Sequence, residues 1–290
     1  MNIAILSRGP GLYSTQSLLI AGQKRGHRMY LIDYSDCSLV LESGRPQVYY
    51  KEERLGRIDA IIPRIGASGT AFGAAIIQQF EMMGVYSVLP SASLLKSRDK
   101  LKSLQLLSNA GIGFPKTFFG HFYQDIDFLL DAVNGLPVVI KLVKGTHGLG
   151  VILAKDRNTA EAIIESYSKL REKFLVQEFV EESSGQDIRA LVVGGQIVAA
   201  MKRKARPGEF RSNLHRGGTS IHIKLTQAEI DTALQSVEIL GLKVAGVDML
   251  QSDRGPLVLE VNASPGLEGI ETTTGIDVAG KIIELIEQQQ

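Results

Sequence analysis

Short apolar runs alternate with longer segments of helical periodicity over roughly the first 90 residues. The runs at 2–7, 28–33 and 59–63 predict strands, and the segments at 15–25 and 70–83 predict helices, each closed by a glycine. This rhythm favours an open parallel sheet with helices on both faces. We therefore expect an α/β domain in the first part of the chain, ending where Pro90 and two serines punctuate the sequence.

The pattern changes after this point, and the last third holds strands joined by tight turns at 193–196 and 252–255. Runs of antiparallel strands with helices on one side suggest α+β lobes. The predicted domains are 1–96, 97–176 and 177–290. The further predicted elements are a basic helix at 98–111, an apolar run at 136–143, strands at 151–154 and 173–180, and helices at 157–172, 227–240 and from 277 onwards.

Composition narrows the class of protein. The chain of 290 residues has 32 Lys and Arg against 31 Asp and Glu, so no overall field draws it to nucleic acid or to an anionic membrane. Its one cysteine, Cys37, excludes a disulfide framework and a cysteine-rich zinc site. No apolar run reaches the ~18 residues of a membrane span, and the first residues lack the basic leader of a signal peptide. We expect a soluble, cytoplasmic protein.

A partial dinucleotide-binding fingerprint follows the first predicted strand. Gly9, Pro10 and Gly11 precede Asp33 by about twenty residues, as in such fingerprints. However, Ser14 replaces the third glycine, and the proline removes an N–H that phosphates would need. Nicotinamide binding is therefore disfavoured. The sequence also contains no Walker A, GxSxG or HExxH motif.

The strongest chemical signal is an acidic hairpin near the C-terminus. If the three-residue turn 253–255 closes a hairpin, Asp248 faces Glu260, and Asn262 follows on the same face. Two carboxylates about 5 Å apart repel each other unless one is protonated or cations bridge them. Oxygen ligands of this kind suit Mg²⁺ or Mn²⁺ completed by nucleotide phosphates. The alternative is a pair of surface acids, which the apolar flanks make less attractive.

Two upstream pieces fit nucleotide binding but are individually weak. Lys141 interrupts an apolar strand, where an ammonium group without an anion is costly, and it precedes a loop with Gly145, Gly148 and Gly150. The segment 175–182 is a strand end that could present backbone groups to adenine. Each piece could equally be an ordinary hairpin or strand end.

The stretch from Lys202 to Arg216 holds six basic residues and one acid. Taken alone, it could contact RNA, form a solvated loop, or clamp a phosphate.

Six sequence blocks accompany these pieces: IPRIG (62–66), QFEMMG (79–84), RDKL (98–101), FRSNLHRGG (210–218), VAGVD (244–248), and EVNASPGLEGIE through TTGID (260–277). In this order they resemble the ATP-grasp superfamily, and within it the RimK-type α-L-glutamate ligases. The resemblance runs along nearly the whole chain. It implies an ATP-grasp fold, in which two α+β lobes grip ATP, preceded by a small parallel-sheet pre-ATP-grasp domain.

The resemblance also implies roles for individual residues. Lys141 would hold phosphate oxygens, with Lys100 as an additional lysine, while Glu178 and Phe179 would meet adenine. Asp187, Arg211, Ser212 and Asn213 would complete the ATP site. Asp248, Glu260 and Asn262 would hold two Mg²⁺ or Mn²⁺ ions. Arg189, Arg203 and Arg211 would clamp the transferred phosphoryl group, and the basic loop would close as a lid.

The activity implied by the resemblance is ATP-dependent ligation of glutamate to the C-terminal tail of a small-subunit ribosomal protein, with polyglutamate synthesis as an extension of that reaction. The partners would be glutamate and this acceptor, with no membrane and no nucleic acid required, and the enzyme would be a homo-oligomer. Two alternatives stay open. One is a ligase that joins another amino acid to a small metabolite or carrier protein, and the other is a non-catalytic module that binds ATP or RNA.

Overall fold

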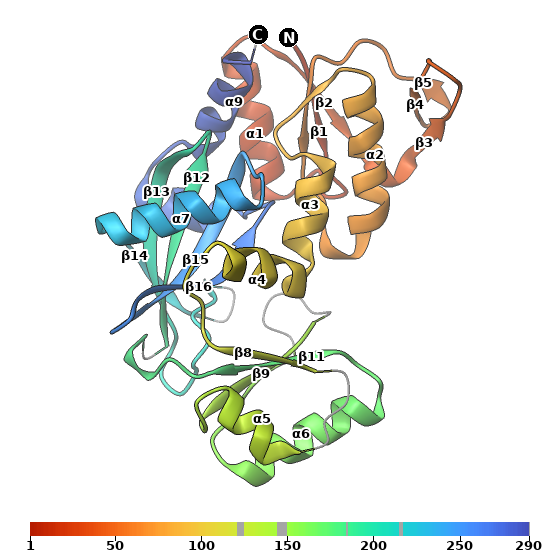
Figure 1. Cartoon of the computed structure of the whole chain (residues 1–290). Helices are drawn as coiled ribbons and strands as arrows, with labels where there is room; N and C mark the ends of the chain where they lie inside the picture. Colours follow the sequence, from red (N-terminus) through yellow and green to blue (C-terminus); the bar gives the residue numbers. More distant parts are fainter. Residues whose placement is uncertain (121–124, 144–149, 184, 215–216, 290) are drawn as a thin grey trace.

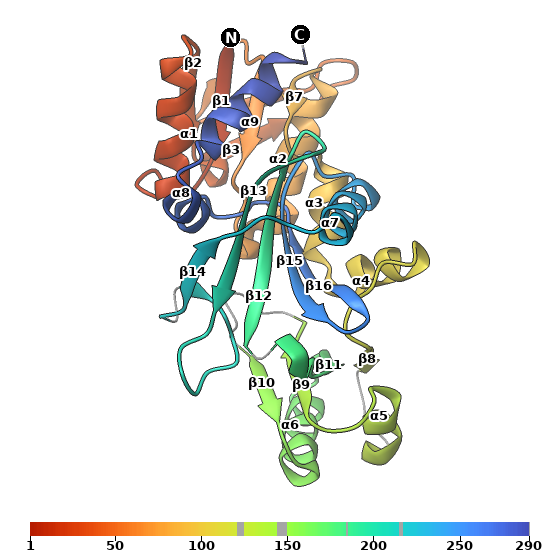
Figure 2. The same cartoon turned by 90° about the vertical axis from the view of Figure 1, so that its left-hand side faces the viewer.

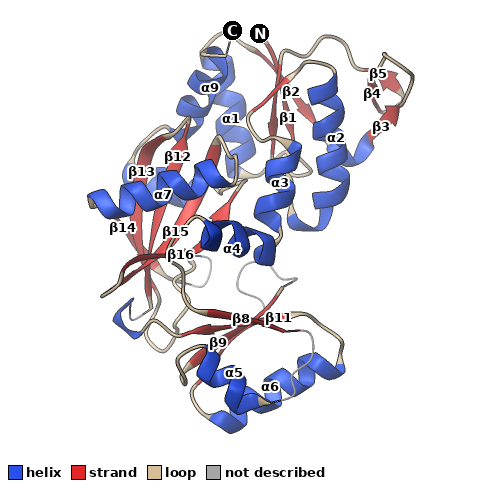
Figure 3. Ribbon diagram, viewed as in Figure 1, coloured by secondary structure: helices blue, strands red, loops and turns tan. Residues whose placement is uncertain are grey.

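The computed structural model describes residues 1–120, 125–143, 150–183, 185–214 and 217–289. Within these residues, the strands form four sheets, and the helices pack mainly around the three largest (Figure 1). Figure 3 shows the lower sheet with its two helices on the outer side, while the other two large sheets share the upper part of the molecule.

The N-terminal sheet is parallel, with the strand order β2-β1-β6-β7. Alternate residues of its first strand enter different cores: Ile3 and Ile5 pack with Leu18, whereas Ala4 and Leu6 pack with Phe80. Helices therefore cover both faces, as the sequence predicts. The elements are β1 (Asn2–Leu6), α1 (Tyr13–Lys24), β2 (Arg28–Ile32), β6 (Ala60–Pro63), α2 (Thr70–Met82), β7 (Tyr86–Ser87) and α3 (Ser91–Arg98).

Several short elements are absent from the predicted set. A three-stranded antiparallel sheet lies between β2 and β6, and its strands are short and mixed in polarity: β3 (Cys37–Val40), β4 (Gln47–Tyr50) and β5 (Glu53–Arg54). The segment predicted as one helix over 98–111 is two helices, because Asp99 has extended backbone angles and its side chain accepts a hydrogen bond from the Lys102 N–H. Arg98 therefore ends α3, and Lys100 begins α4 (Lys100–Asn109).

The central lobe, which we define as residues 117–178, contains an antiparallel sheet of order β10-β9-β11-β8 with two helices on one face. Its buried apolar side chains form a core of their own, built from residues between Ile126 and Val176. Its elements are β8 (Thr117–Gly120), α5 (Ile126–Ala132), β9 (Val138–Leu142), β10 (Val151–Ala154), α6 (Arg157–Lys169) and β11 (Phe174–Glu178).

The C-terminal sheet is antiparallel, with the order β14-β13-β12-β15-β16 (Figure 2). Both of its faces share apolar cores with the N-terminal sheet, so these two sheets form one packed unit. Its elements are β12 (Gln186–Val193), β13 (Gln196–Lys204), β14 (Thr219–His222), α7 (Gln227–Ile239), β15 (Val244–Ser252), β16 (Gly255–Asn262), α8 (Glu268–Thr274) and α9 (Val278–Glu287).

The hairpin β15–β16 corrects one detail of the sequence analysis. Ser252 pairs with Gly255, so the turn has two residues and not the three expected. A bulge after Asp248 restores the register, and Asp248 still lies opposite Glu260. Gly255 has φ of +96°, the left-handed conformation anticipated for this glycine.

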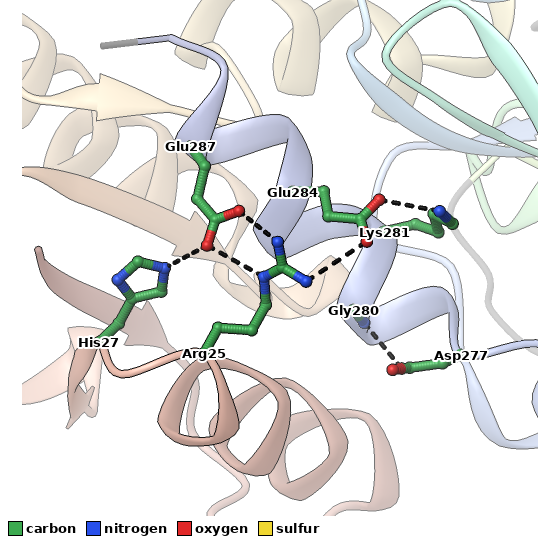
Figure 4. A network of polar contacts seen from close by, with 7 residues as sticks. All are labelled: Arg25, His27, Asp277, Gly280, Lys281, Glu284 and Glu287. Atoms are coloured by element: carbon green, nitrogen blue, oxygen red, sulfur yellow. Dashed lines mark hydrogen bonds and ion pairs between the residues drawn. The ribbon is translucent and has the colours of Figure 1, made fainter.

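Helix α9 packs against α1 and ties the end of the described chain to its beginning (Figure 4). Arg25 donates to both oxygens of Glu287, at 3.0 and 2.5 Å, and to Glu284 at 3.4 Å. His27 lies 2.7 Å from Glu287, and Asp277 caps the helix by accepting from the Gly280 N–H at 2.8 Å. These polar contacts surround an apolar interface that contains Ile3, Leu18 and much of α9.

No helix in the described part of the chain is both long enough and apolar enough to span a membrane.

Candidate active site

The register of the C-terminal sheet brings charged residues to one face. On β12, Asp187 and Arg189 are two residues apart and therefore point the same way. Asp187 pairs with Arg203 on β13, Arg189 pairs with Asp248 on β15, and Asp248 pairs with Glu260 on β16. We call these five residues the acid–arginine cluster.

Two bidentate ion pairs organise this cluster. Arg203 donates to both oxygens of Asp187, at 2.7 and 2.5 Å, and Arg189 donates to both oxygens of Asp248, at 2.7 and 2.6 Å. Arg203 also lies 3.0 Å from Asp248, so one guanidinium joins the two acids. The side chains of Arg203, Asp187 and Asp248 are 5%, 6% and 8% exposed. Paired forks of this kind suit planar anions such as carboxylate and phosphate.

Burial and charge act in opposite directions on Asp248. Burial raises the pKa of its carboxyl, but the charges of Arg189 and Arg203 and their hydrogen bonds lower the pKa on balance. The carboxylate of Asp248 is therefore ionised at neutral pH. For Arg203, burial lowers the pKa, but Asp248 and Asp187 raise it well above its ordinary value. Asp248 and Arg203 are therefore both charged although they are buried.

The three predicted metal ligands lie together at the edge of this cluster. Asp248 and Glu260 are cross-strand partners, and Asn262 lies two residues further along β16, with its amide 3.5 Å from Asp248. Asp248 is buried and held in place, whereas Glu260 is exposed and accessible to a ligand. Two carboxylates and an amide oxygen are donors that Mg²⁺ and Mn²⁺ prefer, so the chemistry of these residues fits such an ion, and binding it would require Asp248 to give up contacts with Arg189 or Arg203.

Lys141 projects from β9 in the central lobe toward the same region. Burial lowers the pKa of its ammonium group to about 8, while Glu260 raises it and Lys100 lowers it further. Its Nζ donates to Gln177, and Lys100 donates to the carbonyl of Val143 at 3.0 Å. The two predicted lysines and the predicted metal ligand Glu260 thus lie within electrostatic reach of one another.

Glu178 and Phe179 lie where the central lobe ends, but the carboxylate of Glu178 is already engaged. It accepts from the Lys116 N–H at 2.8 Å, from Arg254 at 2.5 Å and from Asn134 at 2.7 Å. Burial raises the pKa of Glu178, and these three bonds lower it on balance. The backbone N–H groups of Glu178 and Phe179 are engaged as well, because they donate to the carbonyls of Lys116 and Pro137 at 3.0 and 3.2 Å.

The segment 210–213 approaches the central lobe from the C-terminal sheet. The Phe210 ring lies edge-on to Phe179, with centroids 6.4 Å apart. Arg211 donates to both oxygens of Glu209, at 2.9 and 2.7 Å, and to the Val151 carbonyl of β10 at 3.3 Å. The pair with Arg211 lowers the pKa of Glu209 to about 2. This segment therefore links the two parts of the molecule.

Ser212 is buried, and Asn213 is partly buried. A Cβ at Gly218 would lie 2.9 Å from the Ser212 carbonyl and 3.2 Å from that of Asn213. The glycine of this block therefore lets the two chain segments pack closely. Gly145 and Gly148 of the predicted phosphate loop, and His215 and Arg216 of the predicted lid, lie outside the described residues.

The sequence analysis missed three partners of the predicted residues: Gln177, Glu209 and Arg254. Gln177 joins Lys141 and Thr117 across three strands, at 2.7 Å from the threonine hydroxyl. Its presence inside an apolar strand is a signal that could have been noticed. The Arg254–Glu178 pair spans 76 positions and carries no local signal.

Comparison with known proteins gives a consistent result over the full length. Residues 97–286 match a family described as the RimK-like ATP-grasp domain, and residues 1–94 match the RimK PreATP-grasp domain. A protein of Trichodesmium erythraeum named probable alpha-L-glutamate ligase is 55% identical over 288 residues, which cover 99% of this chain and 96% of that protein.

Solved structures share the fold at low sequence identity. The ATP-grasp ligase PsnB, complexed with a minimal precursor, Mg and ADP, has a TM-score of 0.77 at 19% identity over 99% of this chain and 97% of its own. A D-alanine–D-alanine ligase from Bacillus anthracis, complexed with ATP, has a TM-score of 0.69 at 19% identity, covering 99% and 96%. At this identity the likeness concerns the fold.

Proposed function

We propose that the chain joins glutamate to the C-terminal carboxylate of a protein. The proposal proceeds from the fact that the chain belongs to the RimK-like ATP-grasp family and is an ATP-dependent ligase. The acceptor we infer is the tail of a small-subunit ribosomal protein, and we include polyglutamate synthesis in the proposal. The observation that carries the proposal is the acid–arginine cluster, which places anion-binding forks beside candidate metal ligands.

The proposed reaction has two steps. An acceptor carboxylate oxygen attacks the γ-phosphorus of ATP, the bond to the β-phosphate oxygen breaks, and ADP leaves an acylphosphate behind. The amine of glutamate then attacks the acyl carbon, phosphate leaves, and the amine loses a proton as the amide forms. No nucleophilic side chain is needed, which agrees with the burial of Cys37 and its pKa, raised to about 11 mainly by burial.

The side chains of this chain supply position and charge. Arg189 and Arg203 would bind oxygens of the transferred phosphoryl group, and their guanidinium groups at the face that holds Asp248 support this role. Lys141, whose pKa burial lowers to about 8, would bind phosphate oxygens of ATP. Arg211, in the segment that reaches the central lobe, would also bind the transferred phosphoryl group.

Asp248, Glu260 and Asn262 would hold divalent ions, which neutralise phosphate charge when bound. We propose two ions, because ATP carries about four negative charges that two Mg²⁺ ions would offset.

Two observations bear on the acceptor and the donor. The fold neighbour PsnB is complexed with a precursor peptide, which supports a peptide acceptor here, and the homologues' name supports glutamate as the donor. A ribosomal acceptor would make the enzyme cytoplasmic, and a homo-oligomeric state stays a prediction. The second candidate function, ligation of a different amino acid, is supported by the D-alanine–D-alanine ligase among the fold neighbours.

The decisive experiment incubates the protein with ATP, Mg²⁺, single amino acids and acceptor peptides, and measures ADP and product mass. We expect ADP release and added glutamyl residues with glutamate only. Glu260→Gln should abolish both, while Asp253→Asn, in the exposed turn of the same hairpin, should leave them unchanged. ADP formation with another amino acid and none with glutamate would select the second candidate function.

A further inference from the structure

Two arginines outside the predicted site, Arg64 and Arg98, lie at the end of the N-terminal sheet. Arg64 directly follows β6, which pairs with β1 in the order β2-β1-β6-β7. The chain moves to one side of β1 for β2 and to the other side for β6, so the strand order reverses here. In open parallel sheets, ligands bind in the crevice outside the carboxyl ends of the strands at such a point.

The contacts of these arginines place them beside the candidate active site. Arg64 donates to the Pro265 carbonyl at 2.8 Å, and Arg98 donates to the Ile65 carbonyl at 2.6 Å. Pro265 lies three residues after the predicted metal ligand Asn262. It also packs over Gly246, where a Cβ would lie 3.1 Å from Pro265 and 3.8 Å from the Arg189 Nε.

Neither arginine forms an ion pair with a carboxylate within the part of the chain that the structure describes. The Arg98 Nε is buried and has no hydrogen-bond partner there. Burial and the charge of Arg98 lower the pKa of Arg64 to about 10. Both arginines are partly buried and donate to main-chain carbonyls. Burial lowers the pKa of Arg98 while the charge of Glu260 raises it, and each guanidinium retains donors for an anion.

We propose that Arg64 and Arg98 form a carboxylate-binding site that holds a substrate carboxylate next to the reacting groups. The inference rests on the proposed function, in which both substrates are carboxylic acids. The carboxylate belongs either to the free glutamate, whose two acid groups must be bound while its amine reacts, or to an acidic acceptor tail. Guanidinium groups match such planar anions with two parallel hydrogen bonds.

Arg8 lies at the exposed side of this site. It follows β1, and its Nη1 lies 3.5 Å from the Ser68 hydroxyl in the loop after Arg64. The loop 64–68 therefore carries Arg64 and contacts Arg98 and Arg8. Arg8 is exposed, and the other two arginines are partly buried. This arrangement attracts an acidic substrate and then binds it.

The test measures KM separately for glutamate, acceptor peptide and ATP in Arg64→Gln and Arg98→Gln. The matched control is Arg57→Gln, an exposed arginine that pairs with Asp59 in the same part of the chain. Loss of charge-assisted hydrogen bonds should raise the KM of the bound substrate about 10- to 100-fold, with the KM for ATP within about twofold of wild type. A rise for glutamate identifies the donor, and a rise for the peptide identifies the acceptor.

Because Arg98 also binds the main chain at Ile65, a second measurement uses the unmodified protein. It compares glutamate with glutamine and glutamate α-amide, and an acceptor ending in two glutamates with its amidated version. Loss of the recognised carboxylate should raise KM at least about tenfold. Unchanged KM values for both substrates in the variants, or no discrimination in either series, would overturn the carboxylate site alone. Absence of glutamate-dependent ADP release by the unmodified protein would overturn the proposed function and this inference together.

Discussion

Replacement of Lys141 by methionine should stabilise the ligand-free protein at neutral pH while abolishing ATP binding. Burial lowers the pKa of this lysine from 10.5 to about 8, so its charged form is disfavoured in the fold. At 1.36 kcal/mol per tenfold change in proton affinity, the penalty is roughly 3 kcal/mol at pH 7. Methionine removes this penalty but leaves the Gln177 oxygen without its donor, which costs about 1 to 3 kcal/mol.

The pH dependence separates these two effects. Between pH 8 and 10.5 the unfolded chain binds more protons at this lysine than the folded chain does, so the stability of the wild type rises with pH. The lost hydrogen bond does not vary with pH. The advantage of Lys141→Met in unfolding free energy should therefore shrink by about 2 kcal/mol from pH 7 to pH 9.5.

The assay is urea unfolding of both proteins at the two pH values, without nucleotide or metal. Lys155→Met, at an exposed lysine of the central lobe, serves as the control and should show a difference that is the same at both pH values. An equal difference for Lys141→Met at pH 7 and 9.5 would refute the argument that the Lys141 ammonium group is desolvated. Thermal shifts with ATP then test binding, and the variant should show none.

Three further predictions follow from the ion pairs. Asp248→Asn should reduce Mg²⁺-dependent ADP release to background while circular dichroism shows an intact fold, and turnover at the wild-type rate would exclude a metal ligand. Arg203→Ala should lower the unfolding free energy in urea by about 3 to 5 kcal/mol, because Asp187 stays buried without its partner. The same variant should slow ligation more than it weakens ATP affinity. Equal losses of rate and affinity would indicate a simple nucleotide contact. The ion pair with Arg25 lowers the pKa of Glu287 to about 2, so the stabilisation by this pair is complete above the unfolded pKa near 4.5 and is lost as pH falls toward 2. Glu287→Gln should therefore lower the melting temperature slightly at pH 7, by an effect of at most about 1 kcal/mol. At pH 2 the substitution should not change the melting temperature.

The opposition of Asp248 and Glu260 was predictable from the sequence because it depends on one hairpin. Apolar alternation defines both strands, and a single bulge compensates for the error in turn length. The contacts of Asp187 and Arg189 were not predictable in this way. They depend on the order in which three strands assemble, and no local pattern encodes that order.

The parallel sheet at the N-terminus was predictable for a related reason, since strands such as β1 and β6 are short apolar runs that alternate with helices ended by a glycine. The small sheet after β2 was not, because its strands are short and partly exposed. The break at Asp99 carried a signal that was overlooked: aspartate favours the N-cap, and here it separates two helices. The domain boundaries stay a prediction.

The docking of α9 on α1 has a consequence for biosynthesis. During translation, the strands of the N-terminal sheet leave the ribosome long before the residues that cover one of its faces. The central lobe, whose core comes from a single continuous stretch, can become compact while the remainder is still being made. The apolar core around Ile3 and Leu18 is therefore complete only after the residues of α9, from Val278 onwards, have been synthesised.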